Sequence, residues 1–135
     1  LKKIDNSINF KINNKTGKKV IINFDNEQFN RLFFNLIKNS IESIKEKVKK
    51  TNNSLKNIDI EINQRRDYIT VSLTDTGEGF KDKKTKDIIK PYYTTKQKGT
   101  GLGLSIVDKI INDHNGSIKF LNTNNGAKVQ IIIPK

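Results

Sequence analysis

Two asparagines, Asn35 and Asn39, stand four residues apart in a segment whose apolar residues repeat with helical spacing. On a helix they lie on one face, with roughly 5–6 Å between their Cβ atoms. Asparagine is a middling helix former, so two on one stripe need an explanation. One explanation is the abundance of asparagine in this chain. The other explanation is a Mg²⁺ site. This ion prefers oxygen ligands and keeps several waters, so one amide oxygen together with phosphates can hold it.

A second group of residues follows a predicted strand, where Asp75 precedes Gly77 and Gly79. Alternate glycines let the backbone approach a flat ligand closely. An ionised carboxylate accepts hydrogen bonds and donates none. It therefore favours adenine, whose exocyclic amine donates, over guanine, whose O6 accepts at the same place. An ordinary Asp-x-Gly turn is the alternative interpretation.

The third group is a glycine-rich loop, residues 99–105 (GTGLGLS), which opens a second predicted helix. Free amides at a helix N-terminus can cradle phosphate, and glycines clear the approach. No Lys-Ser/Thr pair follows the glycines, so the loop is not a P-loop. No strand precedes it, as a dinucleotide-binding fingerprint would require.

Periodicity predicts the elements that must position these groups. The polar segment 80–98 is expected to be a long loop, and loops of that length are usually functional or mobile. A mixed sheet covered on one face by helices is the expected architecture, an α+β fold in a single domain over residues 1–135. We expect strands at 7–12, 19–24, 57–64, 67–74, 117–121 and 127–133, and helices at 26–49 and 102–112.

Composition limits the class of protein. The net charge is +12, yet only three of the 26 basic residues are arginines, Arg31, Arg65 and Arg66. Base-reading proteins favour arginine, so we expect no nucleic-acid partner. We attribute the lysines to a solvated surface or to codon bias, with a general attraction of anionic ligands as the alternative. The chain contains no cysteine and no apolar run long enough to span a membrane. We expect a cytoplasmic domain, whether or not the parent protein is anchored in the inner membrane.

Four segments in order resemble one known family. Residues 35–40 (NLIKNS) resemble its N box, 75–79 (DTGEG) its G1 box, 91–96 (PYYTTK) its F box and 99–105 its G2 box. Together they look like the catalytic ATP-binding domain of bacterial sensor histidine kinases, which shares a superfamily with DNA gyrase B and the Hsp90 chaperones. The nitrogen-sensor branch is the most similar. The resemblance implies a two-layer α/β sandwich of the Bergerat type with an ATP lid over 80–98.

The resemblance also implies roles for residues, with ATP or ADP and Mg²⁺ as ligands. Asn39 would bind Mg²⁺, Asn35 would hold the phosphates or the waters of the metal, and Asp75 would bind the adenine amine. Many family members carry a basic residue three positions after the magnesium asparagine, where this chain has Glu42. The remaining implied nucleotide contacts are Gly77 and Gly79 at the adenine, Tyr92, Tyr93, Thr94 and Lys96 in the lid, and Gly99, Thr100, Gly101, Leu102, Gly103 and Leu104 around the phosphates.

One position separates kinases from hydrolases in this superfamily. The hydrolysing members resemble one another in placing a glutamate four residues before the magnesium asparagine, where it can activate water. Asn35 fills that position here and is no base, whereas transfer to an imidazole needs mainly positioning and charge neutralisation. With Lys96 reaching the γ-phosphate, Asn35, Asn39 and Lys96 are the expected catalytic residues of a histidine kinase. A regulatory module that senses ATP without phosphate transfer is the alternative.

The acceptor histidine is expected elsewhere. His114 is the only histidine and stands at the end of the second predicted helix, where we expect it to cap or pack. The chain opens at Leu1 and lacks methionine, so we expect a piece of a larger kinase, with its dimerisation and phosphoacceptor domain upstream. The implied partners are that domain and a response regulator. The isolated domain is expected to be a monomer and the parent a homodimer.

Overall fold

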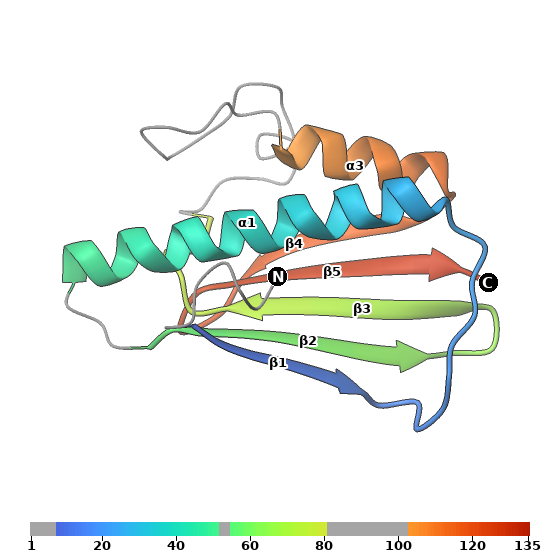
Figure 1. Ribbon diagram of the computed structural model, residues 1–135, viewed down its shortest axis with the longest axis horizontal. Coiled ribbons are helices and arrows are strands. Elements are labelled where there is room, and N and C mark those ends of the chain that lie inside the picture. The colour runs from blue at the N-terminus through green and yellow to red at the C-terminus, as the bar shows by residue number, and fades with distance from the viewer. Residues whose placement is uncertain (1–7, 52–54, 81–102) are drawn as a thin grey trace.

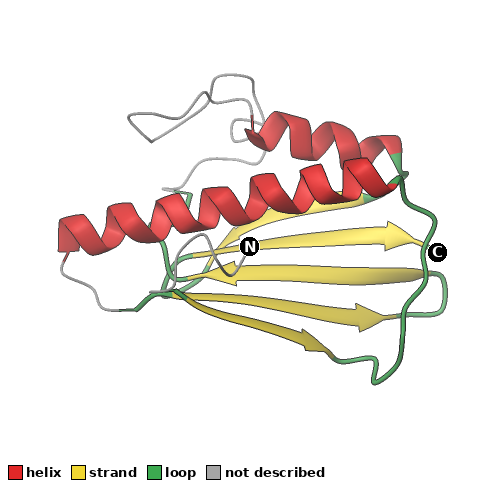
Figure 2. Ribbon diagram, viewed as in Figure 1, coloured by secondary structure: helices red, strands yellow, loops and turns green. Residues whose placement is uncertain are grey.

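The computed structural model describes residues 8–51, 55–80 and 103–135. In these residues two helices lie on one face of a five-stranded sheet, as Figures 1 and 2 show. The elements in chain order are β1 (Asn9–Asn14), α1 (Asn26–Thr51), β2 (Asn57–Gln64), β3 (Tyr68–Asp75), α3 (Gly103–Asp113), β4 (Ser117–Asn122) and β5 (Ala127–Pro134).

The sheet is mixed. Its strand order is β1-β2-β3-β5-β4, in which β1 and β2 run parallel and the other neighbouring pairs run antiparallel. This confirms the predicted α+β architecture of a mixed sheet with helices on one face. It also brings the ends of β3 and α1 and the turn between β4 and β5 to one end of the sheet, where Asp75 lies.

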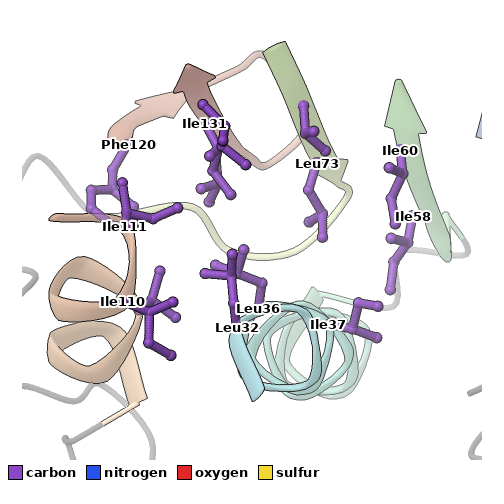
Figure 3. Packing of buried hydrophobic residues seen from close by; sticks show 14 of the residues in the cluster. Leu32, Leu36, Ile37, Ile58, Ile60, Leu73, Ile110, Ile111, Phe120 and Ile131 are labelled. Atoms are coloured by element: carbon purple, nitrogen blue, oxygen red, sulfur yellow. The ribbon is translucent and has the colours of Figure 1, made fainter. Parts of the chain in front are cut away.

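The core fills the space between the helices and the sheet. Alternate residues of the strands point inward, as strand geometry requires, and every third or fourth residue of α1 meets them. Figure 3 shows Leu32 and Leu36 of α1 directed toward the sheet and Ile110 and Ile111 reaching from α3. Each fully buried side chain of this size stabilises the fold by about 1.5–3 kcal/mol. This packing fixes the position of α1 against β3.

The predicted strand at 19–24 is wrong. Among the described strands β1 lies at the edge of the sheet and pairs only with β2, and residues 19–25 form no strand on its other side. The chain instead crosses the end of the sheet and rises to α1, as Figure 1 shows. Val20 and Ile22 still alternate inward against the core, whereas Ile21 is 78% exposed. The alternation of buried and exposed apolar residues that suggested a strand thus reflects packing against the end of the core. Among the described residues, this segment has no neighbouring strand with which to pair.

The start of α1 follows its predicted capping signal. Asp25 accepts a hydrogen bond from the backbone N–H of Gln28 at 2.9 Å, which satisfies one of the free amides of the first turn. The helix then continues two residues beyond the predicted end, to Thr51. Among the described residues no helix is long and apolar enough to cross a membrane.

Candidate functional site

Asp75 ends β3 with its side chain inside the molecule, only 5% exposed. Its Oδ2 accepts the hydroxyl proton of Ser40 at 2.8 Å, and its Oδ1 accepts the backbone N–H of Gly77 at 2.8 Å. Burial raises the pKa of Asp75 above its ordinary value, although bonds from Gly77, Ser40 and the backbone of Ala127 and the charge of Lys47 oppose that rise. A carboxylate held in this way, at the end of a strand, is a candidate for ligand recognition.

The loop after Asp75 is bonded on several sides. The hydroxyl of Thr76 donates to the carbonyl of Leu55 at 3.0 Å, and the backbone N–H of Glu78 donates to Ser43 Oγ at 2.8 Å. The backbone N–H of Phe80 donates to Asn122 Oδ1 at 2.7 Å. The loop 76–80 is therefore held by α1 on one side and by the β4–β5 turn on the other.

Two glycines let this loop pack so closely. A Cβ on Gly77 would lie 2.7 Å from the Cβ of Ser43, and a Cβ on Gly126 would lie 2.7 Å from the backbone nitrogen of Gly77 and against the carbonyl oxygen of Asp75. Gly79 has a φ of +79°, a conformation that favours glycine. Any side chain at Gly77 or Gly126 would push the loop away from α1 or from the turn.

The two asparagines lie on α1, one turn apart, and both are half-buried. Asn35 Nδ2 donates to the carbonyl of Arg31 at 2.8 Å, so the amide oxygen is the atom that Asn35 offers to a ligand. Asn39 directly precedes Ser40, which bonds Asp75. Within about two turns, α1 therefore carries the two asparagines predicted to bind the metal and phosphates and the serine that contacts Asp75, the residue predicted to bind adenine.

The donor chemistry of this helix face suits Mg²⁺. Among the described residues, no three His, Cys, Asp or Glu side chains converge as a metal cluster. A divalent ion beside Asn39 would therefore depend on amide oxygens, on phosphates and on water, which is the ligand set that Mg²⁺ accepts in nucleotide sites.

His114 bonds and packs within the fold, as its place at the end of the second predicted helix led us to expect. Its Nδ1 lies 2.8 Å from the carbonyl of Ile110, and its Nε2 accepts the backbone N–H of Asp25 at 3.2 Å. Its ring stacks on Phe24 with centroids 3.6 Å apart and planes 3° from parallel. Since Nε2 accepts, the proton belongs on Nδ1, and the neutral ring links the end of α3 to the start of α1.

Sequence reasoning missed four residues that shape the loop 76–80. Ser40 and Ser43 follow Asn39 by one and four residues on the same helix, so their spacing could have pointed to the loop. Gly126 lies between the predicted strands 117–121 and 127–133 and received no role. Asn122 gave no signal, because its role depends on a contact between residues 42 positions apart.

A cavity of about 180 Å³ opens beside this loop. It is lined by Lys47, by Gly77 and Glu78, and by the β4–β5 turn at 122–126. Lys47 Nζ donates to the carbonyl of Asn125 at 2.6 Å. The lining includes Gly77, one of the residues predicted at the adenine, and none of Asn35, Asn39 and Asp75.

Much of the predicted phosphate site and lid lies outside the described residues. Gly103 begins α3, one residue later than predicted, and Leu104 is half-buried against the core. The predicted residues outside the described ranges are Tyr92, Tyr93, Thr94, Lys96, Gly99, Thr100, Gly101 and Leu102, together with the lid segment 80–98 beyond Phe80.

Comparison with known proteins agrees with this geometry. The HATPase_c family, described as histidine kinase-, DNA gyrase B- and HSP90-like ATPase, matches residues 24–135. Sporulation kinase C of Bacillus subtilis is 35% identical over 115 residues, which are 84% of this chain and 25% of that protein. A putative NtrY-like sensor histidine kinase of Rickettsia bellii is 31% identical over 105 residues, 78% of this chain and 16% of that protein. The chain thus spans a quarter or less of these relatives.

Solved structures share the fold. The catalytic domain of histidine kinase ThkA, in a nucleotide-free form, superposes with a TM-score of 0.79 at 30% identity, covering 96% of this chain and 81% of that one. The mycobacterial sensor histidine kinase MprB gives a TM-score of 0.80, covering 98% of this chain and 85% of that one, at 16% identity. At that identity the second likeness concerns the fold alone.

Proposed function

Because the chain belongs to the HATPase_c family of histidine kinase-, DNA gyrase B- and HSP90-like ATPases, we propose that it binds Mg-ATP and donates the γ-phosphate to a histidine of a separate domain. Residues 1–135 form one catalytic domain in this proposal. The observation that carries it is the buried Asp75 carboxylate, bonded by Ser40 and Gly77 beside the helix that bears Asn35 and Asn39.

In this function Asp75 accepts a hydrogen bond from the exocyclic amine of adenine, while Gly77 and Gly79 shape the adenine pocket by letting the loop lie close to Ser43 and Asn122. Asn39 would hold Mg²⁺, and Asn35 would hold a phosphate or a water of the ion. Mg²⁺ bound there would supply charge neutralisation at the phosphates. Tyr92, Tyr93, Thr94 and Lys96 of the lid and residues 99–104 complete the nucleotide contacts.

Transfer is favoured over hydrolysis by the nature of Asn35. An amide cannot remove a proton from water at neutral pH, and this one is bonded to the helix backbone at Arg31. Asn35 can therefore align the γ-phosphate without activating water against it. Positioning and charge neutralisation suffice when the acceptor is an imidazole, which is already a nucleophile.

The acceptor belongs to another domain. Both ring nitrogens of His114 have partners within the fold, so this histidine is not offered to a nucleotide. We place the acceptor histidine in a dimerisation domain upstream in the same protein, a homodimer whose phosphoryl group passes to a response regulator, with this catalytic domain on the cytoplasmic side. The relatives are several-fold longer than this chain, which leaves room for such domains in proteins of this kind.

Calorimetric titration of the chain with ATP, ADP and GTP, each with and without Mg²⁺, tests the binding half of the proposal. We expect adenine nucleotides to bind more tightly with Mg²⁺ and GTP to bind at least about tenfold more weakly, since its O6 faces an acceptor. In Asn39→Ala the benefit of Mg²⁺ should disappear, whereas Asn30→Ala, exposed on the same helix, should keep it. Equal affinities for ATP and GTP would count against the proposal.

A further inference from the structure

Ser40 has an unusual position for a serine. It lies in the interior of α1, 4% exposed, among the buried apolar residues Leu36, Ile37 and Ile41. Serine inside a helix usually points to solvent or bonds the carbonyl four residues earlier. Here its hydroxyl donates to Asp75 Oδ2, across 35 residues of sequence. Alanine would suit both the helix and its apolar surroundings better, so the hydroxyl needs a reason.

The hydroxyl completes a defined hydrogen-bond pattern around the carboxylate. Oδ1 accepts from the backbone of Gly77 and Oδ2 accepts from Ser40, both at 2.8 Å. The backbone of Ala127 also bonds this carboxylate. A carboxylate has about four acceptor positions, so with these three donors about one position remains for a further donor. With at least one bond on each oxygen, the carboxylate cannot rotate without losing one of them, and its remaining lone pair points in a fixed direction.

We propose that Ser40 is a positioning residue for base recognition, whose hydroxyl holds the Asp75 carboxylate in the orientation that accepts the exocyclic amine of adenine. The inference rests on the proposed adenine-nucleotide function and adds a residue to it. Because Ser40 directly follows Asn39, α1 then determines both the position of Asn39, the predicted metal ligand, and the orientation of the Asp75 carboxylate.

The hydroxyl also bears on the charge of the carboxylate. Burial raises the pKa of Asp75, and the bond from Ser40 opposes that rise. Lys47 on α1 is the charged group whose field reaches Asp75, while β2 and β5 bring Ile58 and Ala127 alongside it. Glu78, on the following loop, pairs with Lys50 at 3.3 Å. Loss of the Ser40 hydroxyl should therefore raise the pH at which ATP binding declines on acidification.

The test compares two nucleotides in Ser40→Ala. ATP carries the exocyclic amine, whereas purine riboside triphosphate has the same ring, sugar and phosphates without it. We expect the affinity for ATP to fall about tenfold and that for purine riboside triphosphate to change little. Ser43→Ala is the matched control. Its hydroxyl accepts from Glu78 without touching Asp75, so the change should affect both nucleotides alike.

A second readout is the dependence of ATP affinity on pH, whose acidic decline should begin at higher pH in Ser40→Ala than in the wild-type chain. If Ser40→Ala does not fold, Ser40→Cys keeps the shape and a weaker donor and should give a smaller loss, again confined to ATP. Equal loss for both nucleotides, or no loss, in a chain that binds ATP would overturn the role of Ser40 and leave the proposed function intact. A wild-type chain that binds neither nucleotide would refute both.

Discussion

Replacing Asp75 with asparagine should remove base recognition while leaving the fold in place. The amide oxygen can keep the bond from Gly77, and the amide nitrogen then takes the place of Oδ2 beside Ser40. The Ser40 hydroxyl can rotate to accept from it. The second amide proton, however, meets the donating amine of adenine, so a charge-assisted bond becomes a contact between two donors. A bond of that kind contributes about 1.5–3 kcal/mol, which corresponds to about 10- to 150-fold in affinity.

Calorimetric titration with Mg-ATP at neutral pH measures this loss, and thermal unfolding checks the fold. We expect the free energy of unfolding to change by less than about 1 kcal/mol, because the weaker hydrogen bonds are offset by the lower cost of burying an amide than a carboxylate. Asp59→Asn, on the exposed side of β2, is the matched control and should leave affinity unchanged. A folded Asp75→Asn that binds ATP as tightly as the wild type would refute the role of Asp75.

Three further predictions follow from the same contacts. Gly126→Ala should destabilise the fold by about 1–3 kcal/mol and weaken ATP binding, because the added Cβ meets Asp75 and Gly77. Chemical denaturation measures the loss of stability, and Asn124→Ala, at an exposed position of the same turn, is the control. His114→Ala should lower the free energy of unfolding by about 1–3 kcal/mol, since the backbone N–H of Asp25 loses its acceptor. If His114→Ala were as stable as the variant Asp113→Ala, which changes an exposed residue, the structural role of His114 would be contradicted. The raised pKa of Asp75 means that the folded chain holds this proton more tightly than the unfolded chain. Its contribution to stability is therefore fully present below the ordinary pKa of 3.8 and is lost as pH rises through the raised value; urea unfolding across this range should show that loss in the wild type and not in Asp75→Asn.

The sequence predicted well the parts of the fold that local rules govern. The capping pair Asp25 and Gln28 starts α1 as expected, because both residues belong to one turn. The strands 57–64 and 67–74 form the expected antiparallel pair, since a short polar turn joins them. The strand at 19–24 failed because alternation reports which side chains are buried and cannot report whether a neighbouring strand exists.

The residues of the candidate site also fall into two groups, those that local spacing indicates and those that only contacts between distant parts of the chain reveal. Spacing makes Asn35, Asn39, Asp75, Gly77 and Gly79 candidates, because each group lies within a few residues, and their roles stay predictions. Ser40, Ser43, Asn122 and Gly126 act through contacts between distant parts of the chain. Their types fit many roles, so only the packing of α1 and the β4–β5 turn against the loop 76–80 reveals them.

Phosphate transfer from γ-labelled ATP tests the central claim most directly. The chain would be incubated with Mg²⁺ and labelled ATP, alone and together with a separate fragment that carries the acceptor histidine of the parent kinase. We expect no label on the chain alone, because both nitrogens of His114 are bonded within the fold. We expect weak, acid-labile label on the added fragment, weak because no tether raises its effective concentration. Robust label on the chain alone, or rapid phosphate release that Asn35→Ala abolishes, would contradict the account and favour a hydrolase.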